Sequence, residues 1–249
     1  MKKVGIRLAL AAAALLTSVG VQAGVLRTTI TFDPVDTSPL VFPPLLVNGD
    51  EFFQPGLAGG TMWFDPFSNS DLAQPGDLVG SILNGACADL LCPSNNPSNY
   101  VALLDDAVLA FGAIDGFRFS VQSVNASFIG NGTGDPLDAT PGYLALQGVR
   151  NGQALTAYYA LSGVDANGHL NFGNIDTGAF GNFEFDYVFA FAYSCKTVDT
   201  NSSCTAFSSN KAQFALDDIV IEHVPEPASL ALVGVAGLAL MGARRRRAA

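Results

Sequence analysis

Aromatic residues occupy every second position from 183 to 193, within the segment NFEFDYVFAFAYSC. Successive side chains of a β-strand point to opposite faces, so this spacing places six rings on one face. The other face begins with Glu184 and Asp186 and continues with small apolar residues. We therefore predict a strand whose aromatic face lies in a core, although such a row could also form a sugar-stacking platform. The rings are those of Phe183, Phe185, Tyr187, Phe189, Phe191 and Tyr193.

The rest of residues 24–223 is also typical of strands, because glycine, proline and asparagine recur about every ten residues. Strands are predicted at 25–32, 116–128 and 212–224, the last with Phe214, Ile219 and Ile221 in the core. Residues 142–149 and 153–161 form a predicted hairpin around Asn151-Gly152. Residues 96–112 fit a short helix or a strand pair, and residues 33–60 predict long loops around short strands. A single sheet would leave the aromatic face in water, so we expect an all-β, antiparallel two-sheet sandwich.

The first 23 residues have the three parts of a secretory signal peptide. Lys2, Lys3 and Arg7 precede the apolar run 8–16, and small residues occupy the two positions of Val21-Gln22-Ala23 that signal peptidase reads. We predict export through the Sec machinery and cleavage after Ala23. The mature ectodomain would then span residues 24–223.

That ectodomain is strongly acidic. It contains five basic and 21 acidic residues, a net charge of −16. Such a surface repels phosphate backbones, so nucleic acid is an improbable partner. Cations and neutral sugars remain compatible with it.

Four cysteines in an exported chain predict two disulfides. We expect local pairing, Cys87 with Cys92 and Cys195 with Cys204, because each pair lies in or beside a polar loop. Three pairings are possible in principle. A four-cysteine zinc site is disfavoured by the wide spacings and by the oxidising compartment.

The segment 224–249 combines a proline-rich motif, an apolar run and an arginine cluster. Residues 228–243 contain no charge, and a helix of that length spans roughly 24 Å, less than the roughly 30 Å of a bilayer core. We predict a short transmembrane helix with the arginines on the cytoplasmic side. The motif is Val224, Pro225, Glu226 and Pro227, and the basic stop is Arg244, Arg245, Arg246 and Arg247.

These three parts, in this order, resemble the PEP-CTERM sorting signal. The resemblance implies an exosortase that reads the Pro-Glu-Pro motif and removes the tail. It also implies a transient inner-membrane intermediate, and then the cell surface or extracellular matrix of a Gram-negative bacterium that makes exopolysaccharide. The segments TITFDPV and FALDDIVIEHV are similar to the terminal strands of such ectodomains, which implies a jelly-roll-like sandwich related to carbohydrate-binding modules.

A structural calcium ion is the one cofactor that the sequence suggests. Neighbouring residues on a strand face opposite ways, so Asp217 or Asp218 would point inward and need a partner. Related carbohydrate-binding modules imply Asp33 as a further ligand. The favoured alternative is that these aspartates accept backbone N–H groups or pair with an arginine such as Arg27.

No catalytic motif is visible, so we predict no enzymatic activity. His169 lies in a turn-rich stretch, and His223 directly precedes the sorting motif. The expected function is that of a surface or matrix protein, structural, adhesive or glycan-binding, in an exopolysaccharide or biofilm. The alternatives are a secreted hydrolase with a sorting tail and a plain C-terminally anchored membrane protein.

Overall fold

The computed structural model describes residues 24–84, 90–131, 142–198, 201–207 and 212–223. The predicted signal peptide, the motif and arginines of 224–249, and Cys87 therefore lie outside the described residues. Arg27–His223 make up one compact unit. In the described residues no helix is long and apolar enough to cross a membrane.

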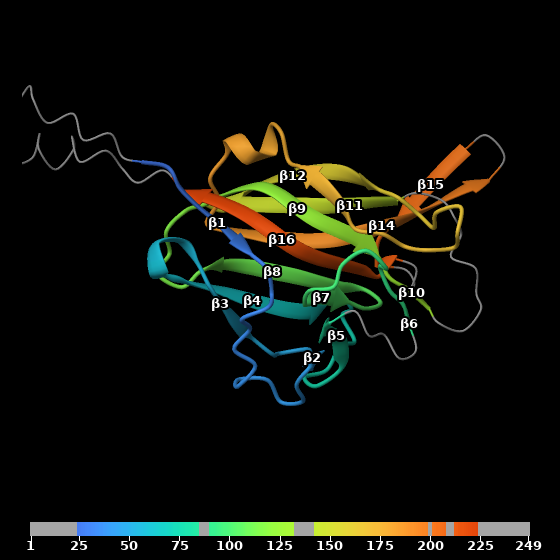
Figure 1. The fold of residues 1–249 in the computed structure, drawn as a ribbon, viewed down its shortest axis with the longest axis horizontal. Helices are drawn as coiled ribbons and strands as arrows, with labels where there is room; N and C mark the ends of the chain where they lie inside the picture. The colour runs from blue at the N-terminus through green and yellow to red at the C-terminus, as the bar shows by residue number, and fades with distance from the viewer. Residues whose placement is uncertain (1–23, 85–89, 132–141, 199–200, 208–211, 224–249) are drawn as a thin grey trace, which may run out of the picture. The chain divides into compact units, whose positions relative to one another are not determined.

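The unit is an all-β sandwich of two antiparallel sheets, as predicted, with two short 3-10 turns in its described part, η1 (Leu57–Gly59) and η2 (Phe180–Asn182) (Figure 1). The first sheet has the order β13-β9-β16-β7-β5-β2, with β1 also paired to β16. Its strands are β1 (Leu26–Ile30), β2 (Leu45–Val47), β5 (Leu78–Leu83), β7 (Tyr100–Leu103), β9 (Ser120–Phe128), β13 (Gly173–Asp176) and β16 (Phe214–His223).

The second sheet has the order β12-β11-β14-β8-β4-β3, with β15 paired to β14. A separate two-stranded sheet joins β6 (Leu90–Leu91) to β10 (Gly130–Asn131). The strands of the second sheet are β3 (Phe52–Pro55), β4 (Thr61–Ser68), β8 (Ala107–Ala113), β11 (Gly142–Arg150), β12 (Gln153–Leu161), β14 (Tyr187–Val198) and β15 (Asn201–Thr205).

The predicted Asn-Gly hairpin is confirmed by the backbone. The β11–β12 hairpin turns at Asn151 and Gly152, whose φ angles of 50° and 74° are those that Asn-Gly turns adopt. Residues 96–112, whose sequence fits either a helix or a strand pair, contain two strands and no helix; β7 belongs to the first sheet and β8 to the second, and the chain passes between them through Asp105. Phe214, Ile219 and Ile221 of β16 are buried in the core, as expected.

Phenylalanines from the first half of the chain fill the interior between the sheets. Phe64 of β4 lies at the centre, with ring centroids 5.3 Å from Phe32, 5.2 Å from Phe52 and 5.6 Å from Phe111. Phe111 reaches Phe119, just before β9, at 5.9 Å and so links the two sheets. These rings are at most 1% exposed.

The prediction that the aromatic face of residues 183–193 lies in the core is wrong. The buried face of β14 is formed by Val188, Ala190 and Ala192, and the aromatic residues of β14 are only half-buried on the outer face. Of the six rings, only that of Phe185 is buried, while Phe183 is 49% exposed. The interior already holds the phenylalanines of the other strands, so this face of β14 has room only for small side chains.

The side-chain alternation shifts where the chain enters β14. Phe185 and Val188 both point inward although three positions separate them, so the strict sequence period is broken at Asp186 and Tyr187. Phe185 stacks on Phe180 of η2 at 4.6 Å. Its ring occupies the space that a side chain at Gly148 of β11 would take.

We predict that Gly148→Ala destabilises the unit by about 1–3 kcal/mol. The added Cβ would overlap the ring of Phe185, which is buried and stacked and so has little room to move. In a protein of this size that loss lowers Tm by roughly 3–10 °C, measurable by thermal denaturation. The matched control is Gly173→Ala in β13, where nothing lies within 4 Å of the added atom. Equal Tm values for the two variants would contradict this packing.

Candidate functional site

The outer face of the second sheet carries a continuous set of aromatic side chains, which we call the aromatic face. The two strands β14 and β4 supply most of them, and the pairing of β14 with β11 and of β11 with β12 adds rings at one end. Tyr158 is 58% exposed and Tyr143 41% exposed, whereas the others are half-buried. In the described residues the aromatic face consists of Phe53, Trp63, Phe67, Tyr143, Tyr158, Tyr187, Phe189, Phe191 and Tyr193.

The four rings on the outer face of β14 form two contacting pairs, which together make a ladder of rings along the strand. Tyr187 and Phe189 have centroids 5.3 Å apart, and Phe191 and Tyr193 are 5.8 Å apart. Phe67 of β4 meets Phe189 edge-on at 6.2 Å. Alternate residues of a strand repeat about every 6.6 Å, so the ladder presents rings at regular intervals.

Trp63 lies flat on the sheet because its neighbour in β8 is a glycine. Gly112 pairs with Trp63 on one side and with Tyr187 on the other. A Cβ at Gly112 would come within 2.7 Å of the indole. The absence of a side chain there lets the indole cover the backbone of β8.

A cleft of about 390 Å³ lies at the end of the aromatic face and is lined by Tyr143, Tyr158, Tyr193 and Cys204. This volume is within the range of ligand sites in proteins. Tyr158 and Tyr193 meet edge-on at 5.8 Å. Burial, and after it the neighbouring Tyr158, raise the pKa of the Tyr193 hydroxyl.

The predicted disulfide Cys195–Cys204 is confirmed and forms one wall of this cleft. It cross-links β14 to β15 between directly paired residues. Cys92 is disulfide-bonded as well and packs against a small core around Tyr100, whereas its predicted partner Cys87 lies outside the described residues.

Polar groups are interspersed among the rings. Asp65 lies between Trp63 and Phe67 on β4, and burial, followed by the nearby Glu51, raises the pKa of its carboxyl group. Gln147 of β11 donates to Thr156 of β12 at 2.9 Å on the same outer face. The face therefore combines apolar rings with hydrogen-bonding groups.

A polar network at the entrance of β14 holds the bend that turns the aromatic rings outward. Asp186 accepts a hydrogen bond from Arg118 Nε at 2.8 Å and one from the backbone N–H of Asn151 at 2.7 Å. Arg118 also donates to the Asn151 side chain at 2.7 Å. The network thus ties the β11–β12 turn to the start of β14. The bond from Arg118, and next the one from Asn151, lower the pKa of Asp186.

Asp217, predicted to point inward, is fully buried and has protein partners. Its Oδ2 accepts hydrogen bonds from Asn96 at 2.6 Å and Ser98 at 3.0 Å, and its Oδ1 accepts the backbone N–H of Asp218. Burial is the main cause that raises its pKa. The neighbouring Asp218 has a positive φ of 46° at a β-bulge and accepts from Asn125 at 2.7 Å. Arg27, the proposed alternative partner, instead pairs with Glu222 at 3.2 Å.

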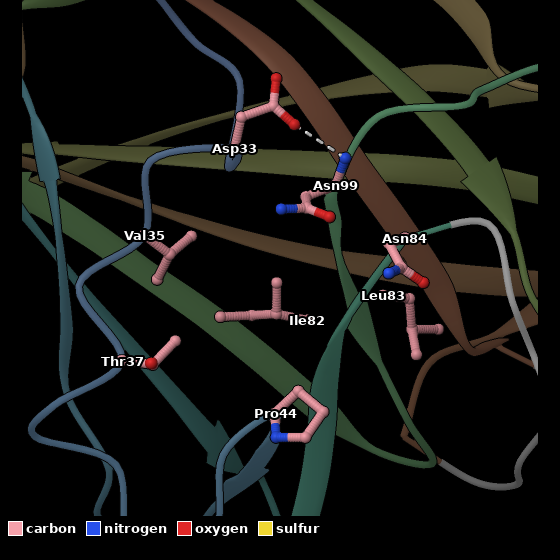
Figure 2. A pocket seen from close by; sticks show the side chains of 8 residues that line it. All are labelled: Asp33, Val35, Thr37, Pro44, Ile82, Leu83, Asn84 and Asn99. Atoms are coloured by element: carbon pink, nitrogen blue, oxygen red, sulfur yellow. Dashed lines mark hydrogen bonds between the residues drawn. The ribbon is translucent and has the colours of Figure 1, made fainter.

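Asp33 lies in a separate, open pocket of about 330 Å³ at the edge of the first sheet (Figure 2). Its Oδ1 accepts the backbone N–H of Asn99 at 3.0 Å. Asn84, Asn99 and Thr37 add polar groups, and Val35, Pro44, Ile82 and Leu83 form the apolar wall.

Asp33 and Asp217 therefore bind different residues of the same segment, 96–99. Within the described ranges, no three His, Cys, Asp or Glu side chains are grouped so that they could hold a metal ion. The calcium ligand set of Asp33, Asp217 and Asp218 stays a prediction from sequence, and the hydrogen bonds of Asp217 follow the favoured alternative.

The two histidines belong neither to the aromatic face nor to the pocket of Asp33. His169 closes an exposed turn in which its backbone N–H bonds to Asp165 Oδ1 at 2.9 Å. His223 ends β16, with Nδ1 3.6 Å from Glu184 Oε1 and its ring 5.3 Å from that of Phe117.

Sequence reasoning missed Tyr143, Tyr158 and Asp65 as site residues. A signal for part of the arrangement was present in the Asn-Gly turn, because the β11–β12 register that it sets places Tyr158 opposite Ala145. The pairing of Tyr143 with Tyr193 depends on the separate register between β11 and β14, which the turn does not set. Asp65 gave no such signal, since its position depends on the pairing of β4 with β8.

We expect Asp186→Asn to destabilise the unit near neutral pH but not in acid. The lowered pKa of Asp186 means that its carboxylate stabilises the fold above the unfolded-state pKa, and this contribution is lost as the pH falls through the folded-state pKa. The side chain is about one third exposed, so solvent screening limits the effect to about 1 kcal/mol or less. Urea unfolding at pH 7 and at about pH 3 measures it. Asp71→Asn in an exposed loop is the charge-matched control, and an Asp186→Asn deficit that persisted at low pH would contradict the assignment.

Comparison with known proteins concerns the end of β16 and the segment after it. Residues 223–247 match the family model described as the PEP-CTERM protein-sorting motif. No match was found among curated proteins or among solved structures. The chain thus carries a PEP-CTERM protein-sorting motif and is an exported protein of the exosortase-sorted kind.

Proposed function

We propose that the β-sandwich is a surface or matrix module that binds a neutral polysaccharide across its aromatic face. The observation that carries the proposal is the ring ladder of β14, which leads into a cleft lined by three tyrosines. Sugar rings have apolar C–H faces that stack on aromatic side chains, and their hydroxyl groups need hydrogen-bonding partners. Asp65, Gln147 and the tyrosine hydroxyls supply such partners along the same face.

The charge of the domain favours a neutral glycan over an acidic one. The ectodomain has a net charge of −16, and the aromatic face carries the acidic Asp65. Bringing a carboxylated or sulfated polymer to it would cost repulsion that a neutral polymer does not meet. A glycan that lies along β14 could contact several rings at once and bind through many weak contacts.

The predicted signals at the two ends of the chain give the route by which the domain would reach such a glycan. Signal peptidase would release residues 1–23, an exosortase would act at the Pro-Glu-Pro motif, and the inner membrane would hold only an intermediate. The arginines at 244–247 would remain inside until processing. The mature domain would then reach the exopolysaccharide or biofilm at the surface of a Gram-negative cell.

Replacement of Tyr143 or Tyr193 by alanine is expected to weaken glycan binding roughly fivefold each, because each change removes a ring worth about 1 kcal/mol. Retardation of the protein in gels that contain a neutral β-glucan measures the affinity, with alginate as the acidic comparison. Phe42→Ala is the matched control, since this ring is 59% exposed but belongs to the segment before β2. Equal retardation of the native protein by alginate and by β-glucan would refute the proposal. A loss of β-glucan affinity in Phe42→Ala as large as in the tyrosine variants would refute it as well.

The same protein and β-glucan samples also test the hydrolase alternative. Asp65, with its raised pKa and the nearby Glu51, is the carboxyl group best suited to acid–base chemistry in the described residues of this face. We expect no release of reducing ends from the β-glucan during binding. Turnover that Asp65→Asn abolishes would establish a hydrolase instead.

The sorting route predicts the ends of the mature protein. Intact mass spectrometry of protein from cells and medium should give a chain that begins at Gly24 and ends between Val224 and Pro227. A glutamate-motif variant, Glu226→Ala, should accumulate in the membrane fraction. A wild-type chain that retains Arg244–Arg247 would show that the segment is a permanent anchor.

A further inference from the structure

In the described residues, six strands of the two sheets pair with only one other strand, namely β1, β2, β3, β12, β13 and β15. Three of the edges that end a sheet are protected against pairing with another strand. β2 has three residues and follows Pro43 and Pro44, which have no N–H group to donate. β3 has four residues and ends in Pro55. β13 also has four residues and ends in the charged, exposed Asp176. Short edges, prolines and charges are the usual means by which proteins prevent edge-to-edge association.

β12, which ends the second sheet, is the longest of these six strands and has none of these features. It runs for nine residues, QALTAYYAL, without a proline or a charge. In the described part of the chain it is paired on one side only, with β11 along its whole length. Five of its residues are exposed, namely Gln153, Ala154, Leu155, Tyr158 and Ala160.

We propose that β12 pairs antiparallel with β12 of a second copy of this chain, so that the two second sheets join into one. The sequence of β12 favours this occupant, and its lack of charge permits the approach. Two ectodomains that each carry −16 repel one another over most of their surfaces, and the uncharged β12 edge is a place where they can approach closely. The free N–H and C=O groups of a strand edge are satisfied by a second strand of the same kind.

The sequence of β12 is self-complementary about Ala157. A two-fold axis there aligns all nine residues, and places Thr156 opposite Tyr158 of the partner subunit on the outer face. On the inner face it places Leu155 opposite the partner's Tyr159, and at the axis it brings the two Ala157 side chains together. The pairing of β11 with β12 assigns these faces, because Thr156 lies opposite Gln147 and Ala157 opposite Leu146. Aromatic residues opposite β-branched or aliphatic ones are favourable cross-strand pairs, and small residues at the axis avoid a clash.

Disulfide trapping in the full-length chain tests both the pairing and its register. Ala157→Cys should form a disulfide-linked dimer under mild oxidation, because directly opposed residues have Cβ atoms about 5 Å apart, within reach of a disulfide. Ala160→Cys should not, because six residues separate it from its own copy along the strand, roughly 20 Å. The double variant Ala154→Cys with Ala160→Cys should again give dimers. Non-reducing gels with peptide mass spectrometry identify the linkage.

Co-purification provides a second measurement that needs no cysteine. Two differently tagged full-length copies are expressed together, and one tag should recover the other for the native sequence. Ala157→Lys should reduce recovery at least tenfold, since it sets two ammonium groups face to face at the axis. Gly173→Lys at the protected edge β13 is the charge-matched control and should not change recovery.

The results of the trapping and co-purification experiments distinguish a paired β12 edge from an unpaired one. Trapping by Ala157→Cys alone among the single variants, together with loss of co-purification in Ala157→Lys, supports the paired edge. Equal trapping at 157 and 160, or no recovery of one native copy by the other, overturns it. Because neither assay uses a glycan, the pairing and the glycan-binding proposal stand or fall separately.

Discussion

The close packing of phenylalanine rings between the sheets is the constraint on which the rest of the structure depends. Phe64 contacts three other rings, and Phe111 extends the cluster to Phe119 at the entrance of the opposite sheet. Once these rings occupy the interior, β14 can present only valine and alanine to it, because protein interiors have no spare volume. The aromatic residues of β14 must then face outward. The polar network of Arg118, Asp186 and Asn151 holds the bend that permits this orientation.

Much of the architecture could be predicted from local sequence, because strand periodicity and turn chemistry are local properties. The Asn-Gly hairpin, the strand at Phe214–His223 and the two-sheet arrangement follow from such signals. The orientation of β14 could not, since both of its faces are apolar along most of its length. Which face is buried depends on the volume that remains between the sheets, and that volume is set by Phe32, Phe52 and Phe111, far away in sequence. For the same reason the sequence left open whether the rings of β14 form a core or a sugar-stacking platform.

Asp217, a candidate metal ligand by its chemistry, makes hydrogen bonds that hold a loop onto the sheet. Its carboxylate is buried, and Asn96, Ser98 and the Asp218 backbone donate hydrogen bonds to it. These bonds attach the 96–99 segment to β16, and Asp33 holds the same segment from its other side through Asn99. The loop that leads into β7 is therefore fixed at two points. A buried acid of this kind is stable only because each of its oxygens has a partner.

The placement of β16 has a mechanical consequence for a protein that ends in a sorting motif. β16 lies inside the first sheet, between β9 and β7, and the match to the motif begins at its last residue, His223. Any tether that continues the chain beyond His223 pulls on an interior strand and not on an edge. A pull along the strand loads its hydrogen bonds to both neighbours together, in shear, whereas an edge strand could be peeled away bond by bond. A domain attached in this way resists unfolding under tension better than one attached through an edge strand.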